Sequence, residues 1–407
     1  MQLLYLIAMY GAEYLGNLIH RELGHEFQKR GHTFRVFALS SAQERRGQPA
    51  DSIEEHIGVH RALTAGNVPA NALNAIGKPF LHYDRFAMGW WKLRTYLARH
   101  PEIDLILAEG AYPFGAMATL ASQKPKLVIT VAGGDFINSR ATQYGYGRFR
   151  TARWLMRYAF EHAAALRVTT PLVQERVRAL GASPEKIARI PRNIAAYCFP
   201  PPSPPLELFR QKQRAELAAK YNLQNANVLV AVGRLLPIKG FDTLLRALPA
   251  IQTRAGETRL LLVGPNRGNY QSELENLAAL CGVRDKVIFT GAIPHQDMPA
   301  LLAASDVIAI PSVLEGMNKI AVEGAAVGTP SVVTRTAGIA DLMTEANVGE
   351  IVEPNNADAL AARIGDLLNN PARRAELGAR GVEWAQQFSS RVVGAQLIEL
   401  CERVVKT

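Results

Sequence analysis

The sequence predicts an α/β protein made of two doubly wound parallel-sheet domains. Short apolar runs of strand type alternate with amphipathic helical patterns along nearly the whole chain, which is typical of parallel sheets covered by helices. The 407 residues also exceed what one hydrophobic core usually supports, since single cores rarely grow beyond about 250–300 residues. A proline-rich stretch, CFPPPSPP at residues 198–205, has the composition of a stiff linker between two such domains.

The first domain is expected to start with a buried strand at residues 3–9 and a loop that contains Gly11. A helical pattern then runs to Gly31, and a second strand follows at residues 33–39. Such a β-loop-α-β start lets backbone amides at a small residue approach a ligand, although a plain tight turn has the same pattern. Further strands are expected where apolar runs precede polar or glycine-rich loops, at residues 103–108, 127–131 and 166–169.

The second half of the chain repeats this alternation and predicts a second doubly wound sheet. Strands are expected at residues 228–232, 259–263, 286–289 and 306–310, with helices that start at Asp242 and Ser272. A final helical pattern runs from Trp384 to Thr407.

The stretch from Pro311 to Pro330, PSVLEGMNKIAVEGAAVGTP, combines a strand end, a loop and a helix. Glu315 lies in the loop and Glu323 lies one or two turns into the helix, which Gly328-Thr329-Pro330 stops. The helix N-terminus offers unpaired N–H groups and a partial positive charge that suit a phosphate, while each carboxylate can accept hydrogen bonds from paired sugar hydroxyls. Two solvated glutamates in an ordinary loop-to-helix turn would show the same spacing.

A second candidate loop, GRLLPIKG at residues 233–240, follows the first strand of the second half. The guanidinium of Arg234 and the ammonium of Lys239 can stabilise the negative charge that grows on a departing nucleoside diphosphate. Loop cations are often only solvated, but the flanking glycines and the two downstream glutamates favour a phosphate site here.

The net charge of +10 comes entirely from the first half of the chain. Residues 1–200 contain 25 Lys and Arg against 15 Asp and Glu, whereas residues 201–407 contain 21 of each kind. This asymmetry indicates an anionic partner of the first half, either a lipid headgroup or a polyanion. Aromatic and basic residues gather at 80–99 and 148–158, which is typical of interfacial helices; helices packed on their own core with a solvated basic face are the alternative.

Targeting and redox signals are weak throughout the chain. No apolar run reaches the ~18–20 residues of a membrane span, and no basic region opens the sequence as in a signal peptide. Three widely spaced cysteines indicate neither a disulfide framework nor a thiolate metal site. We therefore expect a cytoplasmic protein, with a peripheral position on the inner face of the membrane as the open alternative.

Several of these motifs together resemble GT-B retaining glycosyltransferases of the family 4 type, also called glycosyl transferase group 1. The Glu315–Pro330 stretch resembles the family's E-x7-E motif with its G-T-P end, although Asn318-Lys319 replaces the usual pair. The GRLLPIKG loop resembles G-R-x4-K-G, and residues 291–294 resemble the turn that contacts the nucleobase. Gly133 and Asp135 match the H-G-x-D segment, in which Ala132 replaces the histidine.

The resemblance implies a GT-B architecture with the active site in the cleft between two Rossmann-like domains. It implies an acceptor domain at 1–198, a nucleotide-sugar donor domain at 199–385, and a C-terminal helix at 386–407 that crosses back to the first domain. Arg234 and Lys239 would stabilise the leaving diphosphate and Glu315 would orient the donor sugar. Glu323 would bind the ribose diol, with further donor contacts at Gly11, Ala12, Asp135, Gly233, Ile293, Gly316, Met317, Asn318, Lys319 and Ile320.

The implied activity is transfer of a hexosyl group, with retention of configuration, from a UDP- or GDP-sugar to an acceptor hydroxyl on a glycan or a lipid-linked acceptor. No cofactor or metal is expected, because the chain has no Asp-x-Asp and the loop cations already supply positive charge. A sugar-nucleotide epimerase or phosphorylase and a nucleotide-sugar binding module without turnover remain the alternatives. Nucleic acid is not an expected partner, because no recognised motif accompanies the basic charge.

Overall fold

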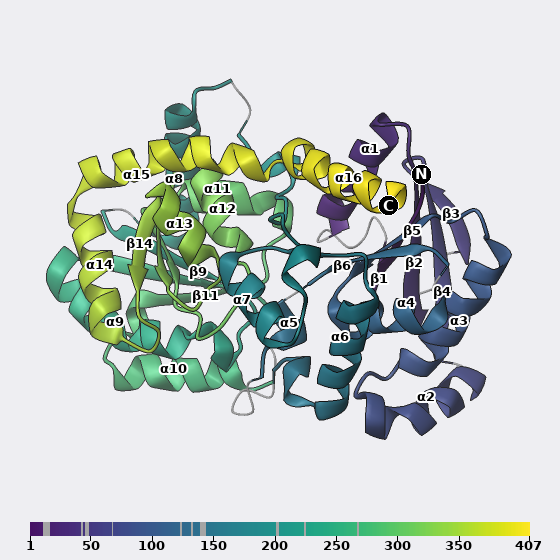
Figure 1. The fold of residues 1–407 in the computed structure, drawn as a ribbon. Helices are drawn as coiled ribbons and strands as arrows, with labels where there is room; N and C mark the ends of the chain where they lie inside the picture. Colours follow the sequence, from purple (N-terminus) through teal and green to yellow (C-terminus); the bar gives the residue numbers. More distant parts are fainter. Residues whose placement is uncertain are drawn as a thin grey trace. The chain divides into compact units, whose positions relative to one another are not determined.

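The computed structural model describes residues 1–10, 17–41, 44, 49–66, 68–122, 124–131, 133–138, 144–200, 203–223, 225–266 and 268–407. These residues form two compact α/β units, which confirms the predicted fold class (Figure 1). Unit 1 comprises Met1–Asn193 and Ser390–Thr407, and unit 2 comprises Ile194–Ser389. These borders lie a few residues away from the positions 198 and 385 that the sequence indicated.

Unit 1 is built on an eight-stranded sheet of order β3-β4-β2-β1-β5-β6-β7-β8. Neighbouring strands are parallel except β3 and β4, which pair antiparallel. The strands are β1 (Gln2–Ile7), β2 (Thr33–Ser41), β3 (Asp51–Glu54), β4 (Ile57–Ala65), β5 (Leu105–Glu109), β6 (Lys126–Thr130), β7 (Ala165–Val168) and β8 (Ile187–Arg189). The strands expected from apolar runs lie within two residues of their predicted ends, because a parallel strand buried on both faces needs a continuous apolar sequence.

Helices of unit 1 cover this sheet and share its core. They are α1 (Leu18–Lys29), α2 (Val68–Leu81), α3 (Phe86–Arg99), α4 (Ala116–Ala121), α5 (Gly133–Phe136), α6 (Arg150–His162), α7 (Pro171–Ala179) and α16 (Ser390–Lys406). α7 is capped by Thr170, whose side chain accepts the Val173 N–H, and Pro171 is its first residue. Figure 1 shows α16 beside α1, and Phe27 of α1 and Leu397 of α16 belong to the same buried cluster as β1.

The helical pattern expected from Trp384 to Thr407 is interrupted once in the structure. α15 ends at Ala385, a short turn carries the buried Phe388, and α16 begins at Ser390. The chain is fixed at this point by side chains: Asn193 Nδ2 donates to Ser390 Oγ and to the Ile19 carbonyl, both at 2.9 Å. These bonds join Asn193 and Ser390, the residues at which the chain leaves and re-enters unit 1, to each other and to α1. None of the helices among the described residues combines the length and the apolar character that crossing a bilayer requires.

Unit 2 is built on a six-stranded parallel sheet of order β11-β10-β9-β12-β13-β14. The strands are β9 (Asn227–Val232), β10 (Thr258–Val263), β11 (Val287–Gly291), β12 (Val307–Ile310), β13 (Ser331–Thr334) and β14 (Gly349–Val352). The helices are α8 (Leu206–Tyr221), α9 (Phe241–Ala255), α10 (Tyr270–Leu280), α11 (Met298–Ala303), α12 (Lys319–Ala326), α13 (Ile339–Ala346), α14 (Ala357–Asn369) and α15 (Pro371–Ala385). Strand order reverses between β9 and β12, and open α/β sheets bind ligands outside the carboxyl ends of their strands at such a switch point.

Candidate active site

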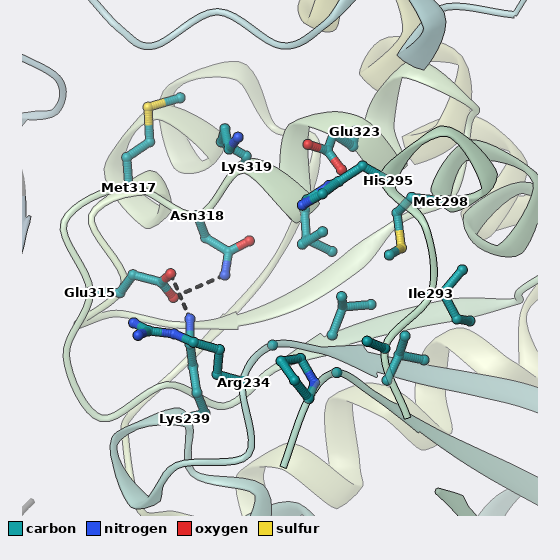
Figure 2. A pocket seen from close by; sticks show the side chains of 17 residues that line it. Arg234, Lys239, Ile293, His295, Met298, Glu315, Met317, Asn318, Lys319 and Glu323 are labelled. Atoms are coloured by element: carbon teal, nitrogen blue, oxygen red, sulfur yellow. Dashed lines mark hydrogen bonds and ion pairs between the residues drawn. The ribbon is translucent and has the colours of Figure 1, made fainter. Parts of the chain in front are cut away.

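A pocket of about 550 Å³ opens in unit 2 at this switch point. Its walls come from the loops after β9, β10, β11 and β12 and from the first turns of α12 (Figure 2). Most of the predicted donor-site residues of unit 2 line it: Gly233, Arg234, Lys239, Ile293, Glu315, Met317, Asn318, Lys319, Ile320 and Glu323. The structure therefore brings together residues that the sequence separates by as many as 90 positions.

The loop after β9 places Lys239 by means of its glycines. A Cβ at Gly233 would lie 3.2 Å from Lys239 Cε, so glycine leaves room for the lysine stem to lie along the backbone. Gly240 has φ +67° and a Cβ there would collide with the Pro311 carbonyl oxygen, so the β9 loop and the β12 loop can approach closely only with glycine. This approach brings the Lys239 ammonium to the segment that contains Glu315.

Glu315 is held by three side-chain donors and by its own backbone. Lys239 Nζ donates to Oε1 at 2.7 Å and Asn318 Nδ2 donates to Oε2 at 2.9 Å (Figure 2). Ser312 Oγ also donates to Oε2, at 3.0 Å. Its N–H donates to the Thr336 carbonyl at 3.1 Å. The carboxylate is therefore fixed in position and its negative charge is balanced by a lysine at its side.

Asn318, which replaces a usual residue of the family motif, has two local roles. Its Oδ1 accepts the Ala321 N–H at 3.2 Å and so caps α12, and its Nδ2 makes the bond to Glu315 described above. An N-cap asparagine satisfies one of the donors that a helix start leaves free. Asn318 therefore caps α12 and also links the start of this helix to the Glu315 carboxylate.

Glu323 lies in the wall of the pocket on α12 and is only 4% exposed. Its carboxylate has no hydrogen-bond or ion-pair partner within the described part of the chain. Burial raises the pKa of Glu323, and the positive charge of Lys319 offsets part of this effect. A buried carboxylate without donors is unfavourable, so a ligand that supplies hydroxyl donors would relieve this cost.

The opposite end of the pocket is less polar. Ile293, Met298 and the peptide at Ala292 line it, and His295 stands between them and Glu323 (Figure 2). Burial lowers the pKa of the His295 imidazole, and the charge of Lys319 lowers it further, so the neutral ring is favoured. Apolar side chains with nearby main-chain groups suit a flat heterocycle. Sequence reasoning missed His295, whose only signal is its place two residues after the Ile293 turn.

Other predicted donor residues are not among the described residues that line this pocket. Gly11 and Ala12, like Ala132, lie outside the described residues. Asp135 belongs to unit 1, where its carboxylate accepts the Ala111 N–H at 2.8 Å and the Tyr112 N–H at 3.4 Å. Gly316 is buried in the loop beside Glu315 and does not line the pocket. In the described ranges, no group of three or more His, Cys, Asp or Glu side chains is arranged to hold a metal ion.

Two family models match the chain. Residues 213–384 match the model described as glycosyl transferases group 1, and residues 19–193 match the model described as glycosyl transferase 4-like domain. The first match covers almost all of unit 2 and the second covers most of unit 1.

Curated relatives and solved structures agree with these matches. The GDP-mannose-dependent alpha-(1-6)-phosphatidylinositol monomannoside mannosyltransferase of Mycolicibacterium smegmatis is 30% identical over 295 residues, which are 70% of this chain and 75% of that protein. The Mycobacterium tuberculosis protein of the same name is 28% identical over 300 residues, 72% of this chain and 74% of that protein.

Among solved structures, Anabaena HepE in complex with UDP superposes with a TM-score of 0.76 at 19% identity, over 99% of this chain and 100% of that chain. Sucrose-phosphate synthase from Thermosynechococcus elongatus superposes with a TM-score of 0.78 at 22% identity, over 100% of both chains. At these identities the likeness shows a shared fold. Fold, motifs and relatives together place this chain in the GT-B glycosyltransferases of the group 1, family 4 type, enzymes that use nucleotide sugars.

Proposed function

We propose that the protein transfers mannose from GDP-mannose, with retention of configuration, to a hydroxyl group of a lipid-linked acceptor. The observation that supports a nucleotide-sugar donor most directly is the pocket of unit 2. There Glu323, which has no partner among the described residues, lines the same space as Arg234 and Lys239. The choice of GDP-mannose and of a lipid acceptor rests on the mycobacterial relatives, which are named as GDP-mannose-dependent mannosyltransferases of phosphatidylinositol monomannoside.

The donor is proposed to lie along the pocket in the order of its side chains. Guanine would occupy the apolar end near Ile293 and His295, and the ribose diol would donate to the Glu323 carboxylate. The diphosphate would lie against Arg234 and Lys239, where preorganised cations stabilise the charge that develops on the leaving GDP. The mannosyl group would then lie beside Glu315 at the other end.

Retention would follow from attack on the face of the sugar that GDP leaves. Glu315 is a poor covalent nucleophile, because three donors already occupy its oxygens. In the proposed step the bond between mannose C1 and the phosphate oxygen breaks, the acceptor oxygen bonds to C1 on the same face, and the acceptor proton goes to an oxygen of the leaving phosphate. The residues then act by position and charge.

The surface of unit 1 supports an acceptor held in a membrane. Trp154 on α6 is 63% exposed and stacks on Tyr158 at 5.9 Å, and Phe80 at the end of α2 is 68% exposed. Arg150 and Arg157 are exposed on the same helix as Trp154. Exposed tryptophan with arginine is typical of surfaces that contact anionic bilayers, so we propose that unit 1 docks peripherally on one.

A donor screen tests the proposal. GDP-mannose should raise the melting temperature and release GDP when an inositol-containing glycolipid or a crude lipid extract is added, and NMR of the product should show an α linkage, as in the donor. The same measurements are made with UDP-glucose, UDP-N-acetylglucosamine and ADP-glucose as alternative donors. The melting temperature reports binding, because a ligand that binds only the native state stabilises it by mass action. Turnover with a UDP-sugar alone would refute the choice of donor. Stabilisation by GDP-mannose without transfer to any acceptor would favour a binding module.

A further inference from the structure

Lys319 is a third cation of the donor pocket. It is the first residue of α12, it lines the pocket, and its side chain is partly buried. Within the described ranges it has no hydrogen-bond or ion-pair partner, whereas Lys239 is paired with Glu315 at 2.7 Å. Lys319 also stands where the family motif has another residue. It therefore needs an explanation of its own.

The charge of Lys319 is unfavourable toward the start of α12 and toward a protonated His295, although it is favourable toward Glu323. The first turn of a helix carries a partial positive charge and favours acidic residues, so a lysine there is repelled by the helix itself. Its charge also disfavours the protonated form of His295 across the pocket. An anion bound at this point would reverse both effects.

The position of Glu323 next to Lys319 indicates what kind of ligand could bind both side chains. Lys319 and Glu323 are four residues apart on α12, about one helical turn, so they lie on the same face of the helix. They could pair with each other, yet the structure forms no ion pair between them and leaves both facing the pocket. A ligand with a phosphate a few bonds away from a pair of hydroxyls would satisfy both side chains at once. A nucleoside 5′-phosphate has this arrangement.

We propose that Lys319 binds the α-phosphate of the donor nucleotide, next to the ribose that Glu323 holds. The β-phosphate then lies toward Arg234 and Lys239, because Lys239 is paired with Glu315 at the sugar end of the pocket. The inference rests on the proposed function only in requiring a nucleotide donor. It assigns Lys319 to nucleotide affinity and leaves the departing β-phosphate to the other two cations.

Ligands with no phosphate, one phosphate and two phosphates distinguish a contact with the α-phosphate from a contact with the β-phosphate. Binding of guanosine, GMP and GDP is measured by calorimetry for the wild type, Lys319→Met, Lys319→Arg and Lys239→Met, with Lys212→Met on exposed α8 as a matched control. Lys319→Met should weaken GMP at least as much as GDP, roughly tenfold or more, and leave guanosine unchanged. Lys319→Arg should restore most of the affinity. Lys239→Met should weaken GDP and spare GMP.

Three outcomes would overturn the assignment. Equal loss for guanosine would mean that Lys319 acts on the base or on the fold, loss for GDP alone would move it to the β-phosphate, and unchanged binding throughout would remove it from the site. The melting temperature of ligand-free Lys319→Met should change little, since the variant loses both the repulsion from the helix start and the attraction to Glu323. If the wild type binds only uridine, UMP and UDP, the same calorimetric comparison is made with these three ligands. If neither series binds, the donor-site proposal itself is wrong.

Discussion

Replacing Glu323 by glutamine should stabilise the ligand-free protein and weaken its binding of nucleotide. The wild-type carboxylate is 4% exposed and has no partner among the residues that the structure describes, and burial raises its pKa. Glutamine keeps the shape and removes the buried charge. Each pKa unit by which the folded-state value exceeds the unfolded value destabilises the wild type by about 1.4 kcal/mol at neutral pH. Because a buried polar group without a partner costs about 1–3 kcal/mol, we expect the free energy of unfolding of Glu323→Gln to be higher by this amount.

The pH dependence of this gain has a definite sign. Because the pKa of Glu323 is raised in the folded state, the advantage of Glu323→Gln over the wild type should be smallest below the unfolded pKa, where both side chains are neutral. As pH rises from that value to the folded pKa, the wild type loses stability relative to the variant, and above the folded pKa the difference is constant. At neutral pH a gain of 1 kcal/mol corresponds to about 2–4 °C in melting temperature for a unit of this size.

Nucleotide binding should change in the opposite direction. The carboxamide of Glu323→Gln keeps one acceptor oxygen but loses the negative charge and the second acceptor for the ribose diol, which should weaken GDP binding by ~1.5–3 kcal/mol. Thermal unfolding from pH 4 to 8, with and without GDP, measures both effects, and calorimetry gives the affinity. Glu273→Gln on α10, an exposed glutamate away from the pocket, is the matched control. A lower melting temperature for Glu323→Gln, or GDP affinity equal to that of the wild type, would refute the reasoning.

Three further predictions concern turnover and docking. Arg234→Ala and Lys239→Ala should each lower kcat by ~10²-fold or more, since each removes a preorganised cation from the leaving diphosphate; steady-state rates that fall less than tenfold would assign them to binding alone. Transfer should continue in EDTA, and activity that a chelator abolishes and Mn²⁺ restores would show a metal requirement. In flotation assays the protein should rise with phosphatidylglycerol vesicles at low salt and remain below with neutral ones. Salt and the Arg150→Glu, Arg157→Glu double variant should reduce this binding; equal behaviour on both vesicle types would leave the basic surface unexplained.

The parallel strands could be predicted from the sequence because burial on both faces makes them continuous apolar runs. β1 is the clearest case, with Leu3 to Leu6 at most 1% exposed. The hairpin strand β3 could not be predicted in this way, since it is a short edge strand, DSIE, in which Ile53 is 80% exposed. α8 also lacks a strong apolar face, with Leu217 as its buried residue, and it is held instead by arginines such as Arg214, which donates to the Ala226 carbonyl.

The candidate site was predictable where its residues form local motifs. The Glu315 to Glu323 segment and the GRLLPIKG loop can be read from the chain, because their glycines and charges lie at fixed spacings. The pairing of Lys239 with Glu315 joins residues 76 positions apart and depends on the close approach of two loops at Gly240. The role of Asn318 depends on side-chain geometry at a helix start, which the sequence alone did not reveal.

The most direct test of the account is a crystal structure of the protein with GDP bound. The ribose hydroxyls should lie within hydrogen-bond distance of the Glu323 carboxylate, with the base near Ile293 and His295. The α-phosphate should contact Lys319, and the β-phosphate should lie against Arg234 and Lys239. GDP bound elsewhere, or bound in this pocket with its ribose away from Glu323, would contradict the account.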